Sequence, residues 1–410
     1  MSNILIYLIA AGLLFQPAGH GEDGLTLEQA VRMALDQNPE ILMAQKEVAL
    51  AMGKRLQMEA LSGPDIVFRD EGLSLKKKTS ENEGQEYSFG IEQGFEFPGK
   101  KALRGEIGRR GEEQSALELE KIRRLVIARV KKSYYKNVLS RRKRESLDKA
   151  AALLDEFIEN LVINYQAGTA SYSDVLRAKV EKARLRNQII EEQTDGVASR
   201  AELNLLLGRR GDEAVNLLTD MVYAPLDKGA SVFKEEARAS SPTLKLLSSK
   251  RRQSEAGLRL AQMNKLPDFS LGLYFPSLRM GSFGFSVGLN VPIWRTKRQG
   301  EIMEAEASND IALLSAEKEE RRLMARIESA YAGAKTAGEQ VKIFEESLLK
   351  DMEDEIKLGI SRYQYGKIEF FNLLDLYRTY AAARLEHLKS LYLYLVSLAD
   401  LEVAGEEYAD

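Results

Sequence analysis

The order of short motifs in the first half of the 410-residue chain recurs in the second half, and this limits the folds open to it. Chance can supply one such match but not a series in the same order, so the chain is predicted to contain two copies of one unit. The matched motifs are Asn38-Pro39 with Ser241-Pro242, Pro64-Asp65 with Pro267-Asp268, Ser88-Phe89-Gly90 with Ser282-Phe283-Gly284, Gly105-Glu106-Ile107 with Gly300-Glu301-Ile302, and Tyr165-Gln166-Ala167-Gly168 with Tyr363-Gln364-Tyr365-Gly366.

Each copy is predicted to contain a helix, two strands, a long helix, a turn and a second helix. The first helix is expected at about 27–62, with Thr26 as its cap, and its counterpart at about 231–264. The predicted divisions are a signal peptide at 1–21, a first repeat at 22–207, a linker at 208–230, a second repeat at 231–404 and a tail at 405–410. The strands are expected at about 65–97 and 267–292, and the helical hairpins at about 99–207 and 294–404.

Two stretches without proline, about 99–163 and about 294–358, are the predicted long helices of the hairpins. At 1.5 Å per residue, about 65 residues extend roughly 100 Å, which is more than a globular core needs. Such helices pack as coiled coils, and small or polar seam residues favour a wide tube of helices. The heptad seams are Leu176, Val180, Ala183, Asn187, Ile190, Thr194, Val197 and Ala201 in the first copy, and Leu385, Leu388, Tyr392, Leu395 and Ala399 in the second.

Apolar residues alternate with small or polar residues along the predicted strands, so each strand has one apolar face and one polar face. Each run has about ten residues, the length of a tilted strand that crosses a bilayer. A hairpin packed on helices in a soluble protein would alternate in the same way, so both readings stay open here. The candidate membrane-facing residues are Phe269, Leu271, Leu273, Phe283, Phe285, Val287 and Leu289.

A sheet in a membrane cannot keep open edges, because lipid offers no partners for backbone N–H and C=O groups. The chain supplies four candidate strands, too few to close a barrel. Three chains of four strands supply 12, within the range of outer-membrane barrels. The predicted fold is therefore an α+β membrane protein, a homotrimer with a 12-stranded β-barrel and long coiled-coil periplasmic helices.

Several function classes find no support in the sequence. An apolar run at 4–15 is typical of a secretory signal peptide and is too short to span a membrane. The chain has no cysteine, its two histidines, His20 and His387, are far apart, and it has no nucleophile–histidine pattern or phosphate-binding loop. No enzyme activity, cofactor or metal site is predicted. The net charge of −3 gives no basic field for nucleic acid.

The duplicated layout and the repeated Tyr-x-x-Gly turns resemble the TolC family of outer-membrane efflux channels. The run Phe97-Pro98-Gly99-Lys100-Lys101-Ala102-Leu103-Arg104 is similar to the strand-to-helix junction of the heavy-metal efflux branch. The resemblance implies a passive exit duct that spans the outer membrane, contacts its lipid and extends into the periplasm. It also implies two partners, a periplasmic adaptor protein and an inner-membrane pump of the resistance-nodulation-division type. The alternative is a soluble periplasmic coiled-coil scaffold or adaptor-like protein.

The resemblance further places the two Tyr-x-x-Gly turns at the periplasmic tip, where the tunnel closes. It implies a gate held by a hydrogen bond from Tyr363 to Asp174, although Asp174 can equally cap the helix after its turn. The implied gate residues are Asp174, Tyr363, Phe370, Phe371, Asn372 and Asp375. The turn residues expected to be exposed to the adaptor are Gly168, Thr169, Ala170, Gly366, Lys367 and Ile368.

Overall fold

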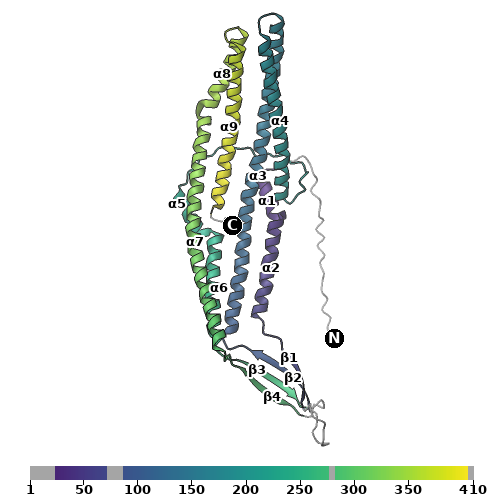
Figure 1. Cartoon of the computed structure of the whole chain (residues 1–410), viewed down its shortest axis with the longest axis vertical. Helices are drawn as coiled ribbons and strands as arrows, with labels where there is room; N and C mark the ends of the chain where they lie inside the picture. The colour runs from purple at the N-terminus through teal and green to yellow at the C-terminus, as the bar shows by residue number, and fades with distance from the viewer. Residues whose placement is uncertain (1–23, 72–85, 277–281, 405–410) are drawn as a thin grey trace, which may run out of the picture.

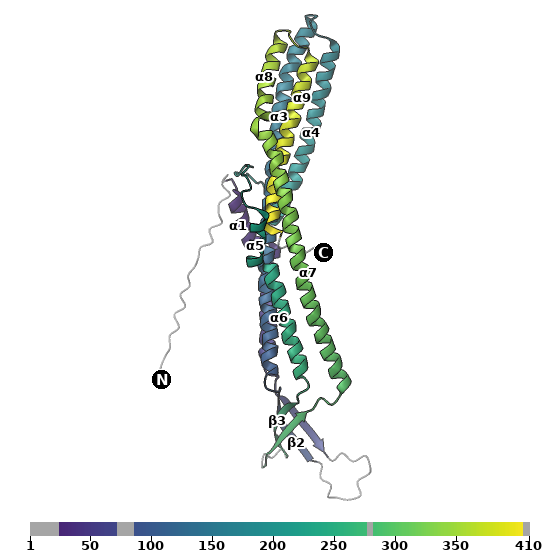
Figure 2. The same ribbon diagram turned by 90° about the vertical axis from the view of Figure 1, so that its left-hand side faces the viewer.

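The computed structural model describes residues 24–71, 86–276 and 282–404, which form one long, narrow body (Figure 1). The strands lie at one end of this body, and the turns of two helical hairpins lie at the other (Figures 1 and 2). The predicted signal peptide at 1–21 and tail at 405–410 lie outside the described residues. Within the described ranges, no helix is both long and apolar enough to cross a membrane.

The four strands predicted per chain are present and form one antiparallel sheet, in which spatial order follows chain order. The register pairs Phe89 with Phe275 and Leu273 with Phe285. Because side chains alternate between the faces of a sheet, these pairs bring the apolar residues of neighbouring strands onto the same face. The strands are β1 (Asp65–Glu71), β2 (Glu86–Phe95), β3 (Asp268–Phe275) and β4 (Gly284–Asn290).

Each strand is joined to one of four helices that pack side by side above the sheet (Figure 1). α3 packs against α2 and α6, and α6 packs against α7. The helix order therefore repeats the strand order, and helices and sheet form one continuous layer. The helices are α2 (Pro39–Glu59) before β1, α3 (Lys100–Gln166) after β2, α6 (Pro242–Met263) before β3 and α7 (Arg295–Ile343) after β4.

At the far end, α3 pairs with α4 (Tyr172–Leu206), and α8 (Leu349–Gln364) pairs with α9 (Phe370–Val403). α9 also packs against α3, so the two hairpins lie side by side with α4 on one flank and α7 and α8 on the other. Their shared core contains the buried side chains of Leu154, Leu161, Val175, Ala178, Phe370 and Leu373. α3 has 67 residues, the length predicted from the absence of proline.

The first helix of each repeat is broken at a proline, where the sequence was expected to form one continuous helix. α1 (Leu27–Gln37) ends at Asn38, whose backbone is extended (ψ 125°) and whose side chain caps α2. α5 (Ala230–Ser240) ends in the same way at Ser241, with ψ 120°. A residue before proline is pushed out of the helical region, so the expectation of single helices is wrong.

The second long helix is also interrupted. The turn Phe344–Leu348 between α7 and α8 is a π-helix, and α8 then continues to Gln364, beyond the predicted end near 358. His387 of α9 lies against this turn, with its Nε2 atom 3.4 Å from Glu345 Oε1. The π-turn therefore faces the middle of α9, within the second hairpin.

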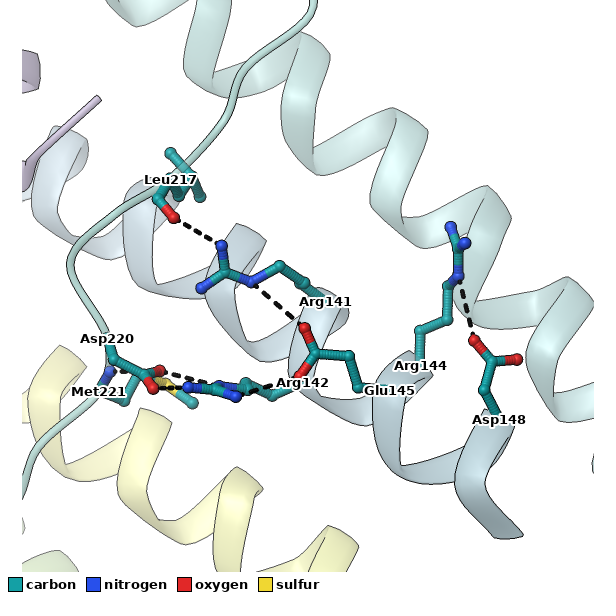
Figure 3. A network of polar contacts seen from close by, with 8 residues as sticks. All are labelled: Arg141, Arg142, Arg144, Glu145, Asp148, Leu217, Asp220 and Met221. Atoms are coloured by element: carbon teal, nitrogen blue, oxygen red, sulfur yellow. Dashed lines mark hydrogen bonds and ion pairs between the residues drawn. The ribbon is translucent and has the colours of Figure 1, made fainter. Parts of the chain in front are cut away.

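The inter-repeat linker is fastened to the side of α3 by arginine side chains (Figure 3). A guanidinium N–H of Arg141 donates to the backbone oxygen of Leu217 at 2.6 Å, and Arg142 Nε donates to Asp220 Oδ1 at 3.1 Å. Arg144 pairs with the acidic residue four positions on, at 3.6 Å. A run of basic residues on a long helix usually forms a solvated face, whereas two of these three arginines hold the linker in place.

Candidate functional site

One face of the sheet is largely apolar across all four strands and carries exposed side chains, with Gln93 of β2 as a polar residue opposite Leu271. Phe285, Val287 and Leu289 of β4 are exposed, and Phe283 lies one residue before this strand and is exposed as well. The cross-strand pairs that bring the predicted residues together are Leu273–Phe285, Leu271–Val287 and Phe269–Leu289. The predicted membrane-facing residues of β3 and β4 therefore share one surface.

β1 extends the same surface, although its residues were not among those predicted. Ile66 and Phe68 are exposed and lie opposite Ile91 and Phe89 of β2. In the sequence, Val67 stands between them and hides the alternation, so only the register of the sheet shows which face they occupy.

The opposite face of the sheet carries mainly small and polar side chains. Gly284 lies opposite Tyr274, and a Cβ atom added to that glycine would come 2.4 Å from the tyrosine ring. Ser270 Oγ donates to Glu92 Oε1 at 2.6 Å across the same face. Small residues with a few polar groups suit the lining of a water-filled pore.

Both edges of the sheet are open within the described residues. β1 pairs with β2 on one side only, and β4 pairs with β3 on one side only. An open edge presents unpaired N–H and C=O groups that another strand can complete.

The heptad seam predicted on α4 lies on the outside of the chain. Leu176, Val180, Ile190 and Val197 are 52%, 52%, 59% and 57% exposed, whereas Val175, Ala178 and Leu185 fill the contact with α3. The seam predicted on α9 behaves differently, because Leu395 and Ala399 are buried within the chain. Exposed apolar stripes of this kind mark surfaces that another protein covers.

The flanking helices near the sheet carry similar exposed apolar residues. Met43 and Leu50 lie on α2, beside the β1 edge, and Met303, Ile311 and Leu314 lie on α7, beside the β4 edge. Each open edge of the sheet is therefore continued by an apolar stripe on the adjoining helix.

The two turns at the far end have the same backbone geometry. Gly168 (φ 76°) and Gly366 (φ 67°) end α3 and α8 in the left-handed conformation that glycine adopts without strain. Thr169 N donates to Asn164 O at 2.9 Å, and Lys367 N donates to Arg362 O at 2.8 Å. These bonds satisfy the last carbonyl groups of each helix and fix the reversal of the chain.

Four of the six turn residues named from the resemblance are exposed: Gly168, Thr169, Gly366 and Lys367. Ala170 and Ile368 are half-buried and pack against the core of the hairpins, so the expectation that they are exposed is wrong. Each follows its turn directly and points back toward the helices. Contact of the exposed residues with an adaptor remains a prediction.

Asp174 takes part in the cap of α4 but is not the N-cap itself. Ser171 is the N-cap: its Oγ accepts from Asp174 N at 3.2 Å and donates to Asp174 Oδ2 at 3.0 Å. Within the described ranges, no hydrogen bond joins Asp174 to Tyr363. The Tyr363 phenol is turned toward Asn164; its pKa is raised, mainly because the ring is half-buried and also by the nearby charge of Asp174, although the Asn164 hydrogen bond opposes this shift.

The two phenylalanines at the start of α9 point in different directions. Phe370 is 4% exposed and its ring centroid lies 5.9 Å from that of Tyr363, whereas Phe371 is 48% exposed. The Arg177 guanidinium of α4 lies 5.4 Å from the Phe371 ring centroid, a cation–π distance. Asn372 and Asp375 are exposed on the same helix.

A buried ion pair joins α4 and α9 near this end, and sequence reasoning missed it. Arg378 Nε donates to Glu181 Oε2 at 2.8 Å, and Glu181 is only 8% exposed. Tyr377 is buried beside them; burial, and then the Glu181 charge, raises the pKa of its phenol. Glu181 follows Ala178 by three residues and precedes Leu185 by four, so heptad spacing would have found it if the inner stripe of α4 had been chosen.

Comparison with known proteins identifies the family. The model for outer membrane efflux proteins matches residues 30–209 and 234–404. The cobalt-zinc-cadmium resistance protein CzcC of Cupriavidus metallidurans is 20% identical over 376 residues, which is 89% of this chain and 86% of that protein.

Two solved structures show the same fold. A crystal structure of CusC aligns with a TM-score of 0.78 and 17% identity, over 92% of this chain and 91% of that one. The open state of the Neisseria gonorrhoeae MtrE outer membrane channel aligns with a TM-score of 0.78 and 15% identity, over 93% of this chain and 88% of that one. The duplicated architecture predicted from the sequence is thus the architecture of known outer-membrane channels. Because the family model covers both repeats, the chain belongs to the outer membrane efflux protein family.

Proposed function

We propose that this protein is the passive exit duct of a tripartite efflux system, built from three copies of the chain in the outer membrane. One observation carries the proposal: a sheet with one largely apolar face has two unpaired edges among the described residues, and exposed apolar stripes continue both edges along the helices. A sheet of this kind is stable in lipid only when its edges are paired.

The geometry favours copies of the same chain as partners. The β1 and β4 edges differ, so joining β4 of one copy to β1 of the next gives a head-to-tail interface, which closes into a ring when the rotation permits. Three copies of the four-stranded sheet give 12 strands, enough for a barrel with a lumen. The exposed stripe on α4 is then covered by the α7–α8 flank of the neighbouring copy.

The polar face of the sheet lines the lumen in this arrangement, and the long helices extend the duct into the periplasm. The family consists of efflux proteins, and this supports a role as a conduit. An inner-membrane pump of the resistance-nodulation-division type supplies the energy, and a periplasmic adaptor docks on the exposed turn residues, Gly168, Thr169, Gly366 and Lys367.

The gate lies at the turns, where the two hairpins meet. Phe370 and Tyr363 pack on each other inside each copy, while Phe371, Asn372 and Asp375 are exposed. Asp174 shapes the tip through its Ser171 cap. The Glu181–Arg378 ion pair adds a contact between the hairpins that must move when they separate.

The similarity to the cobalt-zinc-cadmium resistance protein favours divalent metal cations as cargo. A strain that lacks this protein should then be more sensitive to cobalt, zinc or cadmium salts, and the wild-type chain should restore growth. Unchanged metal tolerance, together with sensitivity to organic toxicants, would exclude metals as the main cargo and leave the duct itself in place.

The proposal is tested by the mass of the native protein, extracted from isolated outer membranes and corrected for bound detergent. A mass of three chains is expected. A monomer in the soluble periplasmic fraction would refute the duct and favour a coiled-coil scaffold.

A further inference from the structure

An ion pair with a buried lysine holds the junction between the sheet and the helices, where the first repeat meets the second between β2 and β3. Lys100 is 5% exposed, and its Nζ atom donates to Asp268 Oδ1 at 2.8 Å and to Leu266 O at 2.9 Å. The same carboxylate oxygen accepts from the backbone N–H of Phe97 at 2.8 Å. These bonds join the segment that follows β2, in the first repeat, to the start of β3, in the second repeat.

The duplication supplies a second set of the same groups. Lys100 is the first residue of α3, and Arg295 is the first residue of α7. Asp268 is the first residue of β3, and Asp65 is the first residue of β1. Each repeat therefore carries a cation at the start of its long helix and a carboxylate at the start of its first strand. Within the described residues, only the pair between Lys100 and Asp268 is made.

The other pair cannot form inside one chain, because Arg295 follows β4 and Asp65 begins β1, at opposite edges of the sheet. Both residues are exposed, and neither has an ion pair or a side-chain hydrogen bond within the described ranges. The first turn of α7 contains Arg295, Lys297 and Arg298 and no acidic residue. Cations at a helix N-terminus are unfavourable because of the helix dipole. A carboxylate from another copy of the chain would therefore stabilise this turn.

We propose that Arg295 of each copy pairs with Asp65 of the neighbouring copy where the barrel meets the helices. The proposal rests on the head-to-tail ring of the proposed function and assigns the residues that close it. Applied to β4 and the next β1, the β2–β3 register places Leu289 opposite Ile66 of the neighbouring copy and Val287 opposite its Phe68. Both pairs fall on the apolar face, so that face continues unbroken across the junction.

The sizes of neighbouring residues support the same junction. Inside the chain, Gly99 is the N-cap of α3, and a Cβ atom at this position would lie 2.9 Å from the Met263 side chain. Its counterpart, the N-cap of α7, is Trp294, the only tryptophan of the chain, which is 74% exposed. The counterpart of Met263 is Ala60, five residues before Asp65 as Met263 is five before Asp268. Inside the chain, the small residue is at the helix N-cap (Gly99) and faces the large Met263. At the proposed junction between copies, the large residue is at the N-cap (Trp294) and would face the small Ala60.

Charge exchange tests the pair. Asp65→Arg and Arg295→Asp each place like charges together at every junction, and the double variant restores opposite charges. Extracted at equal detergent and protein concentration, each single variant should lose at least tenfold in the ratio of trimer to monomer, and the double variant should recover most of it. Lys297→Asp is the matched control, because Lys297 lies in the same turn and already pairs with Glu301. Any loss of trimer that Lys297→Asp causes should not be reversed by Asp65→Arg. A double variant no better than the single variants would overturn the pairing.

Cross-linking gives a second test that does not depend on trimer stability. The chain has no cysteine, so Asp65→Cys with Arg295→Cys introduces the only thiols. A disulfide requires Cα atoms within about 7 Å, closer than a long side chain and a carboxylate need to be, so a short bis-maleimide is the better reagent. Covalent dimers and trimers are expected from the double variant and not from either single one. A normal trimer mass without a cross-linked ladder refutes the pairing alone, whereas a monomeric wild-type chain refutes the ring itself.

Discussion

The Glu181–Arg378 pair allows the energy of the proposed gate to be tested. Replacing Arg378 with leucine leaves the Glu181 carboxylate buried between α4 and α9, with the exposed Arg184 at 3.8 Å as its remaining cation. Removing one partner of a fully buried ion pair costs about 3–5 kcal/mol. Arg378 keeps 37% of its side chain exposed, so water already screens part of the attraction. We therefore expect a cost of about 2 kcal/mol, a factor of about 30 in the equilibrium between closed and separated hairpins.

Tyr377 limits this cost. Its hydroxyl oxygen is buried and has no hydrogen-bond partner within the described residues. Because burial and the Glu181 charge raise its pKa, the phenol stays neutral and is available as a donor to the Glu181 carboxylate when Arg378 is removed. Arg378→Leu combined with Tyr377→Phe removes this donor as well, and it should open the hairpins further than Arg378→Leu alone.

Amide hydrogen exchange of peptides covering 172–185 and 370–380 measures the separation, and single-channel conductance in planar bilayers measures its effect on the duct. Arg378→Leu should raise both. Glu181→Leu with Arg378→Leu removes both charges and should return exchange to near the wild-type value, because two apolar residues replace a buried pair at little cost. Arg177→Leu is the matched control, as it removes an arginine at an exposed cation–π contact worth about 0.5–1 kcal/mol. Unchanged exchange and conductance in a trimeric Arg378→Leu protein would refute the assigned role.

Three further outcomes are expected. Ile190→Asp on the exposed stripe of α4 should reduce the trimer fraction in native mass spectra, whereas Gln188→Asp beside the stripe should leave it unchanged. Gly366→Ala should lower the free energy of unfolding by about 1 kcal/mol and so lower the denaturation midpoint of the extracted protein. The cost comes from backbone strain at φ 67°, because no atom lies within 4 Å of the added methyl group; an unchanged midpoint would contradict this assignment. The hydrogen bond from Arg129 holds the pKa of Glu40 below its usual 4.5, so the pair stabilises the folded state above that pH and loses its contribution as the pH falls through the lower folded pKa. Arg129→Gln should therefore flatten the loss of stability between roughly pH 5 and pH 3, and an unchanged pH profile would show that the pair contributes nothing.

The spacing of residues along the sequence predicts much of the fold. Alternation in β3 and β4, the proline-free stretch of α3 and the glycines at the turns are signals that need no knowledge of distant residues, and each appears in the structure where expected. The second long helix also forms, but a π-turn interrupts it. The breaks at Asn38 and Ser241 were also present in the sequence as residues before proline, but the apolar pattern on either side obscured them.

The contacts of the candidate site were harder to predict from the sequence. The resemblance named the turns, yet the expected Tyr363–Asp174 hydrogen bond is replaced by contacts with Asn164 and Ser171, which depend on how two hairpins from different repeats pack. The Glu181–Arg378 pair escaped notice for the same reason, since its partners are far apart in the sequence.

By itself, the sequence determined the periods, the duplication and therefore the order of elements, because these depend on residues a few positions apart. Only the tertiary structure decided which stripe of each helix is covered. On α4, two stripes have the spacing of a coiled-coil seam, and packing against α3 uses the one that contains Val175, Ala178 and Leu185. The other stripe remains exposed together with the edges of β1 and β4, because the described part of a single chain has no further layer to cover it.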